Sequence, residues 1–247
     1  MRKVLPGHTP KKRSKGKRAE ILSGIVILCT VASLLLVTGL SYIHNAETEK
    51  ASGFAIYKGD TARDEAAMMF NVYEGNESIY AILEILRKNS SKATFFIGGI
   101  WAEKHPEVLL DIVRNGHELG CHGYLHKDHS KMSVEQNKEE IAICSELVKK
   151  ITGVTIRLFA PPSGAFNENT EIACKALGQK MILWTKDTID WRDRDVDLLV
   201  KRATKNISRG DLILMHPKTQ TVAALPRIIE AYQNEGFSLL SVSEVIG

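Results

Sequence analysis

The sequence predicts an α/β domain of alternating strands and helices, preceded by one N-terminal membrane-spanning helix. Residues 21–43 carry no charged side chain, and strand-like and helix-like apolar patterns alternate from residue 66 onward. The chain has 247 residues, 44% of them hydrophobic and 25% charged, which is typical of a globular protein. Four cysteines are too few for a disulfide-stapled scaffold. An aromatic content of 6% argues against a base-stacking nucleic-acid surface, so no nucleic-acid partner is expected.

The positive charge of the chain lies in its N-terminal tail. The net charge is +4, but residues 1–20 contain eight basic side chains and one acid, which gives this tail +7. The remaining 25 basic and 28 acidic residues give the rest of the chain −3. Residues 21–43 follow directly and would span about 34 Å as a helix, enough for a bilayer core of about 30 Å. The positive-inside rule then predicts a cytoplasmic tail at 1–20 and an exported C-terminal part.

A cleaved signal peptide is the alternative to this anchor. Its apolar region usually has about 7–15 residues and precedes a small-residue cleavage site. The stretch here is longer, and residues 43–46 make a poor cleavage site. We therefore expect a single-pass cell-membrane protein with an extracellular C-terminal domain, whose basic tail attracts anionic lipid. Cys29 lies in the predicted span, so an odd number of cysteines is exported and no disulfide framework is expected.

The predicted elements follow one another regularly after a linker at residues 44–65, which can hold one short strand at 54–57. Apolar runs predict seven strands, at 66–72, 92–98, 117–122, 155–160, 180–186, 211–215 and 237–242. Apolar residues at helical spacing predict helices at 79–86, 108–113, 133–151, 172–177, 196–207 and 223–232. Ser133 and Gln136 form a capping-box pattern at the start of the longest helix, and Gly153 closes it.

Repeated strand–helix units imply parallel strands covered by helices. An open doubly wound sheet and a closed barrel both fit this pattern. No glycine-rich dinucleotide fingerprint and no phosphate loop follow the first strand. Chemistry gathers at the C-terminal ends of the strands in either architecture, so the polar residues just after each strand are the candidates for a site.

Three histidines and two aspartates follow predicted strands and should meet at one rim. They are His122, His126, His216, Asp187 and Asp190. His122 and His126 are four residues apart and could reach one ion such as Zn²⁺, although a pair of surface histidines would show the same spacing.

Taken alone, the other polar groups have ordinary explanations. His216 is consistent with a structural histidine, and Asp190 with a helix cap. The Cys121 thiol is expected to be a small buried packing group. Three further residues are expected to be solvated and to have no role, namely His117, Asp128 and His129.

The set as a whole fits metal-assisted acyl hydrolysis. A metal can activate water for attack on a carbonyl, and a histidine across the pocket can protonate the leaving nitrogen. An aspartate beside that histidine would raise its pKa, so that the histidine starts protonated.

The order of the motifs resembles the polysaccharide deacetylase family, which is carbohydrate esterase family 4 or the NodB homology domain. The resemblance covers residues 66–247, and the segment 101–106 is most similar to sporulation-type and related Gram-positive members. The matching blocks, in order, are 92–96, 116–120 and 122–126, then 161–164, 190–191 and 212–217.

This resemblance implies a distorted (β/α)7 barrel that acts on N-acetylated polysaccharide such as peptidoglycan or chitin-like chains. His122 and His126 would bind a divalent metal, commonly zinc. His216 would be the general acid and Asp190 its partner. Trp191 would shape the pocket, and the main-chain N–H of Ser163 would stabilise the oxyanion.

The sequence departs from the family where the base should be. The family's first motif is Thr-Phe-Asp-Asp, and residues 69–72 read Met-Phe-Asn-Val. Asn71 cannot accept a proton as a base, and Val72 cannot ligate a metal. The supporting arginine is replaced by Ala160, and Arg157 lies three residues too early.

Three hypotheses follow from these departures. The first is an active deacetylase with a rearranged base, for which Glu74 is the nearest carboxylate in the loop. The second is a catalytically silent barrel that binds cell-surface glycan, and the third is a purely structural tethered domain. Two histidines are fewer than the usual three protein ligands, so we expect weak metal binding unless another group substitutes.

Overall fold

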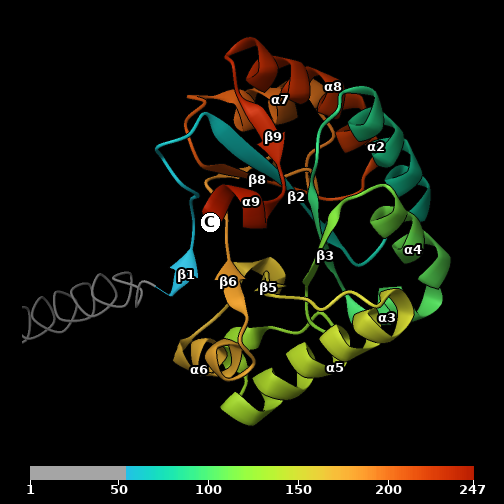
Figure 1. Ribbon diagram of the computed structural model, residues 1–247, viewed down its shortest axis with the longest axis vertical. Helices are drawn as coiled ribbons and strands as arrows, with labels where there is room; N and C mark the ends of the chain where they lie inside the picture. The colour runs from blue at the N-terminus through green and yellow to red at the C-terminus, as the bar shows by residue number, and fades with distance from the viewer. Residues whose placement is uncertain (1–53) are drawn as a thin grey trace, which may run out of the picture. The chain divides into compact units, whose positions relative to one another are not determined.

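The computed structural model describes residues 54–247, whose strands form one curled parallel sheet (Figure 1). The strands are β1 (Ala55–Ile56), β2 (Glu65–Val72), β3 (Thr94–Ile97), β4 (Glu118–Cys121), β5 (Leu158–Phe159), β6 (Lys180–Ile182), β7 (Lys186–Asp187), β8 (Asp211–Met215) and β9 (Ser238–Leu240). Their order is β1-β6-β5-β4-β3-β2-β8-β7, and β9 pairs with β2. Every pairing between these strands is parallel, as the sequence predicts.

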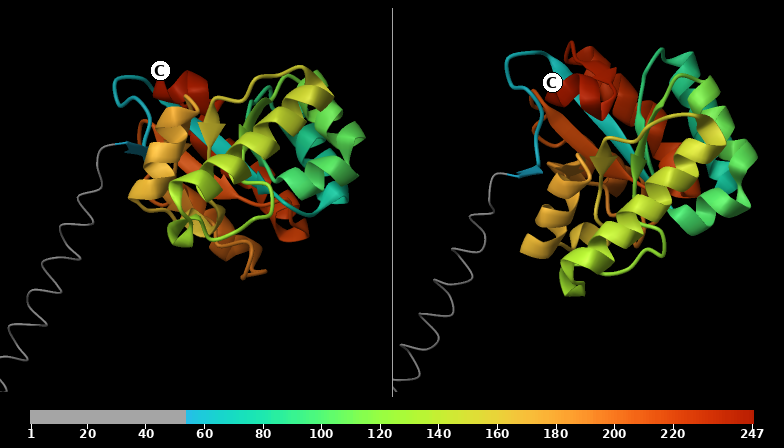
Figure 2. Two further views of the ribbon diagram at one scale, coloured as in Figure 1. Left: turned by 90° about the horizontal axis from the view of Figure 1, so that it is seen from below. Right: turned by 60° about the horizontal axis from the view of Figure 1, so that its bottom comes forward.

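Most of the helices lie on the outside of the curled strands, as Figures 1 and 2 show, whereas the C-terminal helix packs through Val242 and Val245 against the apolar cluster inside the curl. The helices are α2 (Asn76–Lys88), α3 (Gly99–Lys104), α4 (Pro106–Arg114), α5 (Val134–Thr152), α6 (Glu168–Ala176), α7 (Val196–Thr204), α8 (Thr219–Asn234) and α9 (Val242–Ile246), with 3-10 turns η1 (His129–Lys131) and η2 (Pro162–Gly164). The capping box of α5 is formed by Ser133 and Gln136, and Gly153 ends this helix with a left-handed φ of 77°. The predicted limits of α5 are therefore confirmed.

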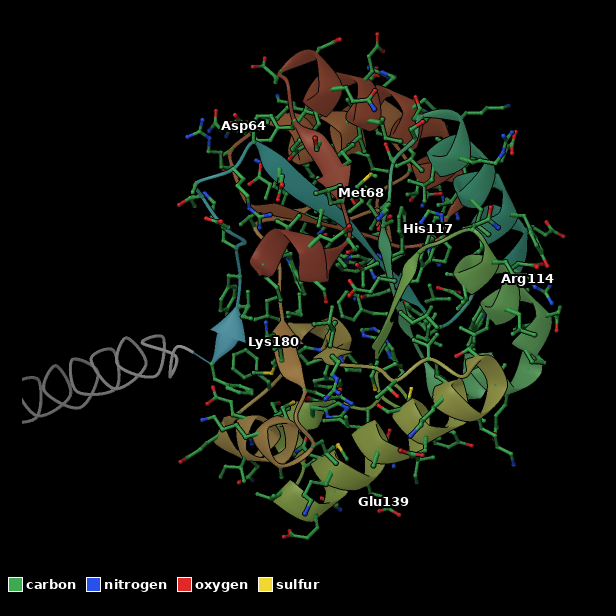
Figure 3. All side chains as sticks on the ribbon, viewed as in Figure 1. Asp64, Met68, Arg114, His117, Glu139 and Lys180 are labelled. Atoms are coloured by element: carbon green, nitrogen blue, oxygen red, sulfur yellow. The ribbon has the colours of Figure 1, made fainter. Side chains whose placement is uncertain are left out.

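Two apolar clusters lie on the two faces of the strands. Met68 and Phe70 of β2 belong to the cluster under the helices, whereas Ala67 and Met69 belong to the cluster inside the curl. This alternation follows from the two-residue period of a strand. Figure 3 shows Met68 within the molecule and the charged side chains of Arg114 and Glu139 on the outer surface. Asn71 continues the inward-facing positions of β2, and Val72 belongs to the cluster under the helices.

Two details of the predicted barrel are wrong. The expected strand at 180–186 is two strands, because β6 pairs with β1 and β5 whereas β7 pairs with β8. Residues 183–185 thus connect strands that lie far apart in the sheet order. The expected strand at 237–242 ends at Leu240, and the capping box of Ser241 and Glu244 begins α9 instead. The parallel strands form a curled half-barrel, which is consistent with the distorted (β/α) barrel that the family resemblance implies.

The basic tail 1–20, the apolar segment 21–43 with Cys29, and residues 44–53 of the predicted linker lie outside the described residues. Among residues 54–247, no helix combines the length and the apolar character that crossing a membrane requires. Cys121, Cys144 and Cys174 are buried free thiols, and Cys121 belongs to the core, as expected.

Candidate active site

A pocket of about 260 Å³ lies at the C-terminal ends of the strands. It is lined by Asn71, Tyr73, His122, His126, Ser163, Trp184, Asp187, Trp191, Leu214 and His216. Asp190 is fully buried and in contact with His216. The structure therefore brings together every residue that the sequence assigns to catalysis, substrate binding or metal binding. Their roles remain predictions.

A main-chain hydrogen bond holds the His122 ring in one neutral tautomer. Its Nδ1 donates a hydrogen bond to the carbonyl oxygen of Ala160 at 2.7 Å, so Nε2 keeps its lone pair. Burial, together with the neighbouring His126, lowers the pKa of His122 to about 3. His122 is thus a neutral donor of an electron pair, which is the form that binds a metal or accepts a hydrogen bond.

The loop that carries His126 is held by a buried carboxylate of α5. Glu140 Oε2 accepts the main-chain N–H groups of Tyr124 at 3.0 Å and Leu125 at 2.8 Å. Lys127 Nζ lies 3.1 Å from Glu140 Oε1 and balances its charge. His126 follows with a left-handed φ of 54°, and its ring centroid lies 5.1 Å from that of His122.

His216 and Asp190 form a buried pair on the opposite side of the pocket. His216 Nδ1 donates to Asp190 Oδ1 at 2.7 Å, and the main-chain N–H of His216 donates to Oδ2 at 2.7 Å. Thr221 donates its hydroxyl to the same Oδ2 at 2.6 Å. These three contacts fix the carboxylate, which in turn holds the ring by its Nδ1–H and leaves Nε2 to carry the proton that a general acid would donate.

Among residues 54–247, no carboxylate occupies the position of the missing base in β2. Asn71 lines the pocket at 3% exposure, and its Oδ1 has no hydrogen-bond partner among the described residues. Val72 packs under the helices and does not line the pocket. Glu74, the alternative base, lies in a neighbouring groove, where it pairs with Lys218. Arg157 is exposed before the start of β5, at the opposite end of the strands, so it does not substitute for the missing arginine.

The donor set does not fit a divalent metal. Among residues 54–247, no three His, Cys, Asp or Glu side chains lie close enough to hold one ion. The Tyr73 ring occupies part of the space instead, with its centroid 4.2 Å from that of His126 and 6.0 Å from that of His216. Among the described residues, His122 and His126 are thus the paired donors, and weak metal binding stays a prediction.

Residues 58–182 match the sequence profile of the family described as Polysaccharide deacetylase. The chain belongs to the polysaccharide deacetylase family. It is 36% identical over 193 residues to the Bacillus subtilis protein YlxY, a match that covers 77% of this chain and 60% of that protein. It is 28% identical to a peptidoglycan-N-acetylglucosamine deacetylase of Bacillus cereus, over 76% of this chain and 91% of that enzyme.

Solved structures include both active and inactive relatives of this fold. A carbohydrate esterase family 4 pseudoenzyme from Bacillus anthracis superimposes with a TM-score of 0.77 at 32% identity, covering 81% of this chain and 71% of that one. A mutant of that pseudoenzyme with restored enzymatic activity superimposes equally well, at 30% identity. Membership of the deacetylase family therefore does not by itself establish hydrolysis.

Four residues that line the pocket have no role assigned from the sequence, namely Tyr73, Trp184, Asp187 and Leu214. Tyr73 and Asp187 follow strands and were visible as candidates, whereas Trp184 comes from the connection between β6 and β7. Asp187 Oδ1 accepts the main-chain N–H of Ile189 at 2.8 Å, and burial raises the pKa of Asp187. Asp187 is the one carboxylate among the residues that line the pocket.

Two histidines expected to be solvated are buried. His129 is fully buried, and its Nδ1 donates to Asn137 Oδ1 at 2.6 Å because η1 folds back against α5. His117 is 8% exposed beside Phe95, where burial lowers its pKa to about 4. The solvated interpretation was wrong for both, whereas Asp128 does lie at the surface and caps η1.

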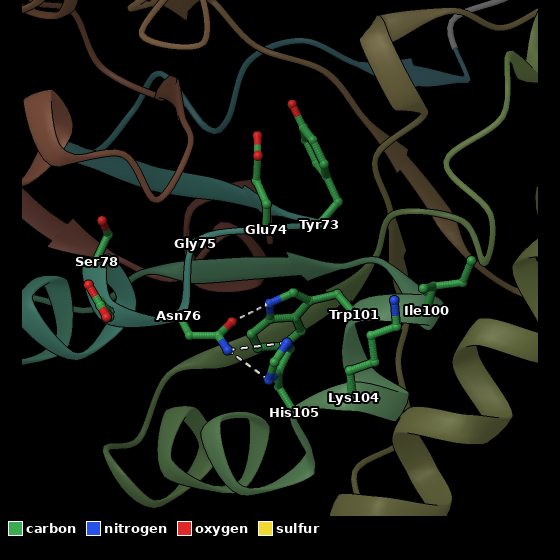
Figure 4. Close-up of a pocket in the computed structure, with 10 residues that line it drawn as sticks. Tyr73, Glu74, Gly75, Asn76, Ser78, Ile100, Trp101, Lys104 and His105 are labelled. Carbon is green, nitrogen blue, oxygen red and sulfur yellow. Dashed lines mark hydrogen bonds between the residues drawn. The ribbon is translucent and has the colours of Figure 1, made fainter.

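A larger groove adjoins the pocket at Tyr73 and has a volume of about 590 Å³ (Figure 4). Asn76 fixes its floor: Oδ1 accepts the Trp101 indole N–H at 2.8 Å, and Nδ2 lies 2.7 Å from His105 Nδ1. Figure 4 shows Tyr73 and Glu74 on one side of this groove and Lys104 on the other. The pocket therefore continues into an open surface depression that could accommodate a polymer.

Proposed function

We propose that this chain is a cell-surface member of the polysaccharide deacetylase family that binds N-acetylated cell-wall glycan without efficiently hydrolysing it. The observation that carries the proposal is the content of the pocket. It keeps the histidine pair and the His216–Asp190 pair, but Asn71 stands in the position of the base, and residues 54–247 supply no third metal ligand.

The features that would bind a sugar are retained. Trp191 lies at the rim with 53% of its surface exposed, and an exposed indole provides a flat apolar face for a pyranose ring. Asn71 Oδ1 is buried and unpartnered, so a ligand N–H such as that of an acetamido group would satisfy it. The names of related deacetylases that act on peptidoglycan support this class of ligand.

The features that would activate water are missing. Amide hydrolysis needs a group that takes a proton from the attacking water, and a carboxamide does not do so at neutral pH. The family would use a divalent metal to make that water more acidic, but the donor set here does not fit one. The similarity to a solved pseudoenzyme supports this interpretation.

We further propose that residues 21–43 anchor the protein in the cell membrane, with the basic tail inside and the barrel outside. The uncharged length of this segment and the +7 charge before it support this topology. An extracellular barrel would meet cell-wall glycan directly. Immunoblotting of membrane and soluble fractions tests the anchor, and a shortened soluble product would contradict it.

Sedimentation with purified insoluble peptidoglycan tests glycan binding. The full chain should co-sediment, and Trp191→Ala should weaken binding by about 1–2 kcal/mol. Tyr80→Ala is the matched control, because Tyr80 on α2 is similarly exposed, at 45%, but does not line the pocket. Equal loss in both variants, or no binding by the full chain, would refute the proposal.

Residual hydrolysis is a second candidate, favoured by the intact His216–Asp190 pair. Asp187 would take a proton from the attacking water as the carbon–oxygen bond forms. His216 would give a proton to the nitrogen as the carbon–nitrogen bond breaks, releasing acetate and an amine. Asp187→Asn should then abolish acetate release while glycan binding persists, and unchanged release would exclude this role of Asp187.

A further inference from the structure

A second groove lies on the far side of Trp191 and has a volume of about 800 Å³. Trp191 lines both this groove and the candidate pocket, so a chain bound in the pocket can extend into it. The charged side chains that line this groove are Arg192, Arg194 and Lys218, and all three are cationic. We call it the basic groove.

The cations of the basic groove exceed the carboxylates that contact them. Arg192 donates two hydrogen bonds to the Asp193 carboxylate, at 3.0 and 3.1 Å. Arg202 forms an ion pair with the same carboxylate at 2.7 Å, so one carboxylate balances two guanidinium groups. Lys218 pairs with Glu74. The exposed Arg194 forms no ion pair within residues 54–247. Part of the positive charge is therefore free to attract an anionic ligand.

Two structural details favour an anion at this place. Arg202 also donates to the carbonyl oxygen of Thr188 at 3.0 Å, which fixes the loop that carries Arg192. The N-terminus of α8 reaches the same groove through Thr219 and Gln220 and has no side-chain cap. Its main-chain N–H groups add positive potential to that of the side chains.

The groove at Tyr73 has a different charge, although it meets the basic groove at Gly75 and Ser78. Glu74 and Glu77 line it together with Lys104 and His105, so its formal charge is not positive when the histidine is neutral. Of the two grooves, the basic groove alone has a lining with a net positive charge. A glycan that extends beyond the pocket can therefore place an acidic sugar in the basic groove and a neutral sugar in the groove at Tyr73.

We infer that the basic groove binds a carboxylate-bearing sugar next to the residue that occupies the pocket. The ligand class is an acidic N-acetylated glycan, such as one with lactyl carboxylates on alternate sugars. Arg194 and Arg192 contact the carboxylate and select for it. The inference rests on the proposed glycan binding of the pocket, and it adds a preference for acidic over neutral chains.

Isothermal titration of the full chain tests this preference. The probes are peptide-free chains of alternating N-acetylglucosamine and N-acetylmuramic acid, and neutral N-acetylglucosamine chains of equal length. The acidic chain should bind more tightly at low salt, and added salt should reduce the difference. Arg194→Glu should weaken binding of the acidic chain about three- to tenfold and leave the neutral chain unchanged.

Arg157→Glu is the matched control, because it makes the same charge change on an exposed arginine at the opposite end of the strands. This control also keeps the +7 tail, which could attract polyanions by itself. Equal affinity for the two chains would overturn the basic groove while leaving glycan binding intact. Equal loss in Arg194→Glu and Arg157→Glu would show unspecific attraction and would overturn it as well. Absence of binding to both chains would instead refute the proposed function.

Discussion

Protonation of His117 should make the barrel less stable in mild acid. This histidine lies at the start of β4, away from the pocket, and Figure 3 labels its position beside the sheet. Its side chain is buried against Phe95, its Nδ1 has no hydrogen-bond partner among the described residues, and nearby Lys92 also disfavours a positive charge. Burial is the larger cause and lowers the pKa to about 4 from the ordinary value near 6.5.

The direction of the effect follows from proton uptake by the unfolded chain. Between pH 6.5 and about 4 the unfolded state binds a proton at this position and the folded state does not. Stability from His117 is therefore complete above pH 6.5 and is lost as the pH falls toward 4. The loss is about 1.36 kcal/mol per pH unit, or about 2 kcal/mol at pH 5.

Urea unfolding of the wild-type chain and of His117→Leu at pH 7.5 and pH 5 measures this contribution. Leucine removes both the proton site and the unpartnered nitrogen, so the variant should gain about 2 kcal/mol relative to wild type on acidification. The other histidines titrate in both proteins and cancel in the comparison. Lys138→Gln, an exposed change on α5, should behave as wild type. A wild-type–variant difference that is the same at both pH values would refute the reasoning.

Three further predictions concern the pocket. Zinc should not raise the Tm of the wild-type chain in calorimetry. Asn71→Asp adds a carboxylate beside the histidine pair, so zinc at a hundredfold excess over its Kd should stabilise this variant by about 2.7 kcal/mol. Equal Tm shifts in the two proteins would contradict this prediction. Asp190→Asn should lower the free energy of unfolding in urea by about 1–2 kcal/mol and should move the His216 proton from Nδ1 to Nε2. Nitrogen NMR of the His216 ring measures this tautomer, and an unchanged spectrum would contradict that role of the carboxylate. Tyr73→Ala should lower the free energy of unfolding in urea by about 1 kcal/mol, because the ring contact with His126 is lost. An unchanged free energy of unfolding would contradict this contribution of the ring.

Most of the fold was predictable because its elements are encoded locally. The capping residues of α5 and the apolar run of β2 are short local patterns that identify these elements without information from distant residues. Both elements lie where the sequence predicts them. The break between β6 and β7 was not predictable, because Leu183 is apolar and buried like a strand residue. The break arises because β6 pairs with β5 whereas β7 pairs with β8, and strand pairing depends on residues distant in the sequence. The start of α9 is encoded locally, because Ser241 and Glu244 form a capping-box pattern that is incompatible with a strand continuing to residue 242.

The pocket was predictable from the rule that polar residues gather at strand ends, whereas its detailed chemistry was not. Asn71 and His216 meet as that rule predicts. The two-residue period of the strand places Val72 on the helix side, but the sequence could not show that Tyr73 fills space beside His126, because that depends on how the chain turns after β2. The burial of His129 depends on a loop folding against α5, which local patterns do not encode.

Acetate release is the most direct test of glycan binding without hydrolysis. The full chain would be incubated with peptidoglycan and with N-acetylglucosamine oligomers, in the presence of zinc or cobalt, at concentrations where binding is saturated. The pocket of Asn71, His122 and His126 predicts saturable binding and no acetate above the rate without protein. Acetate release that His216→Ala abolishes would contradict the account.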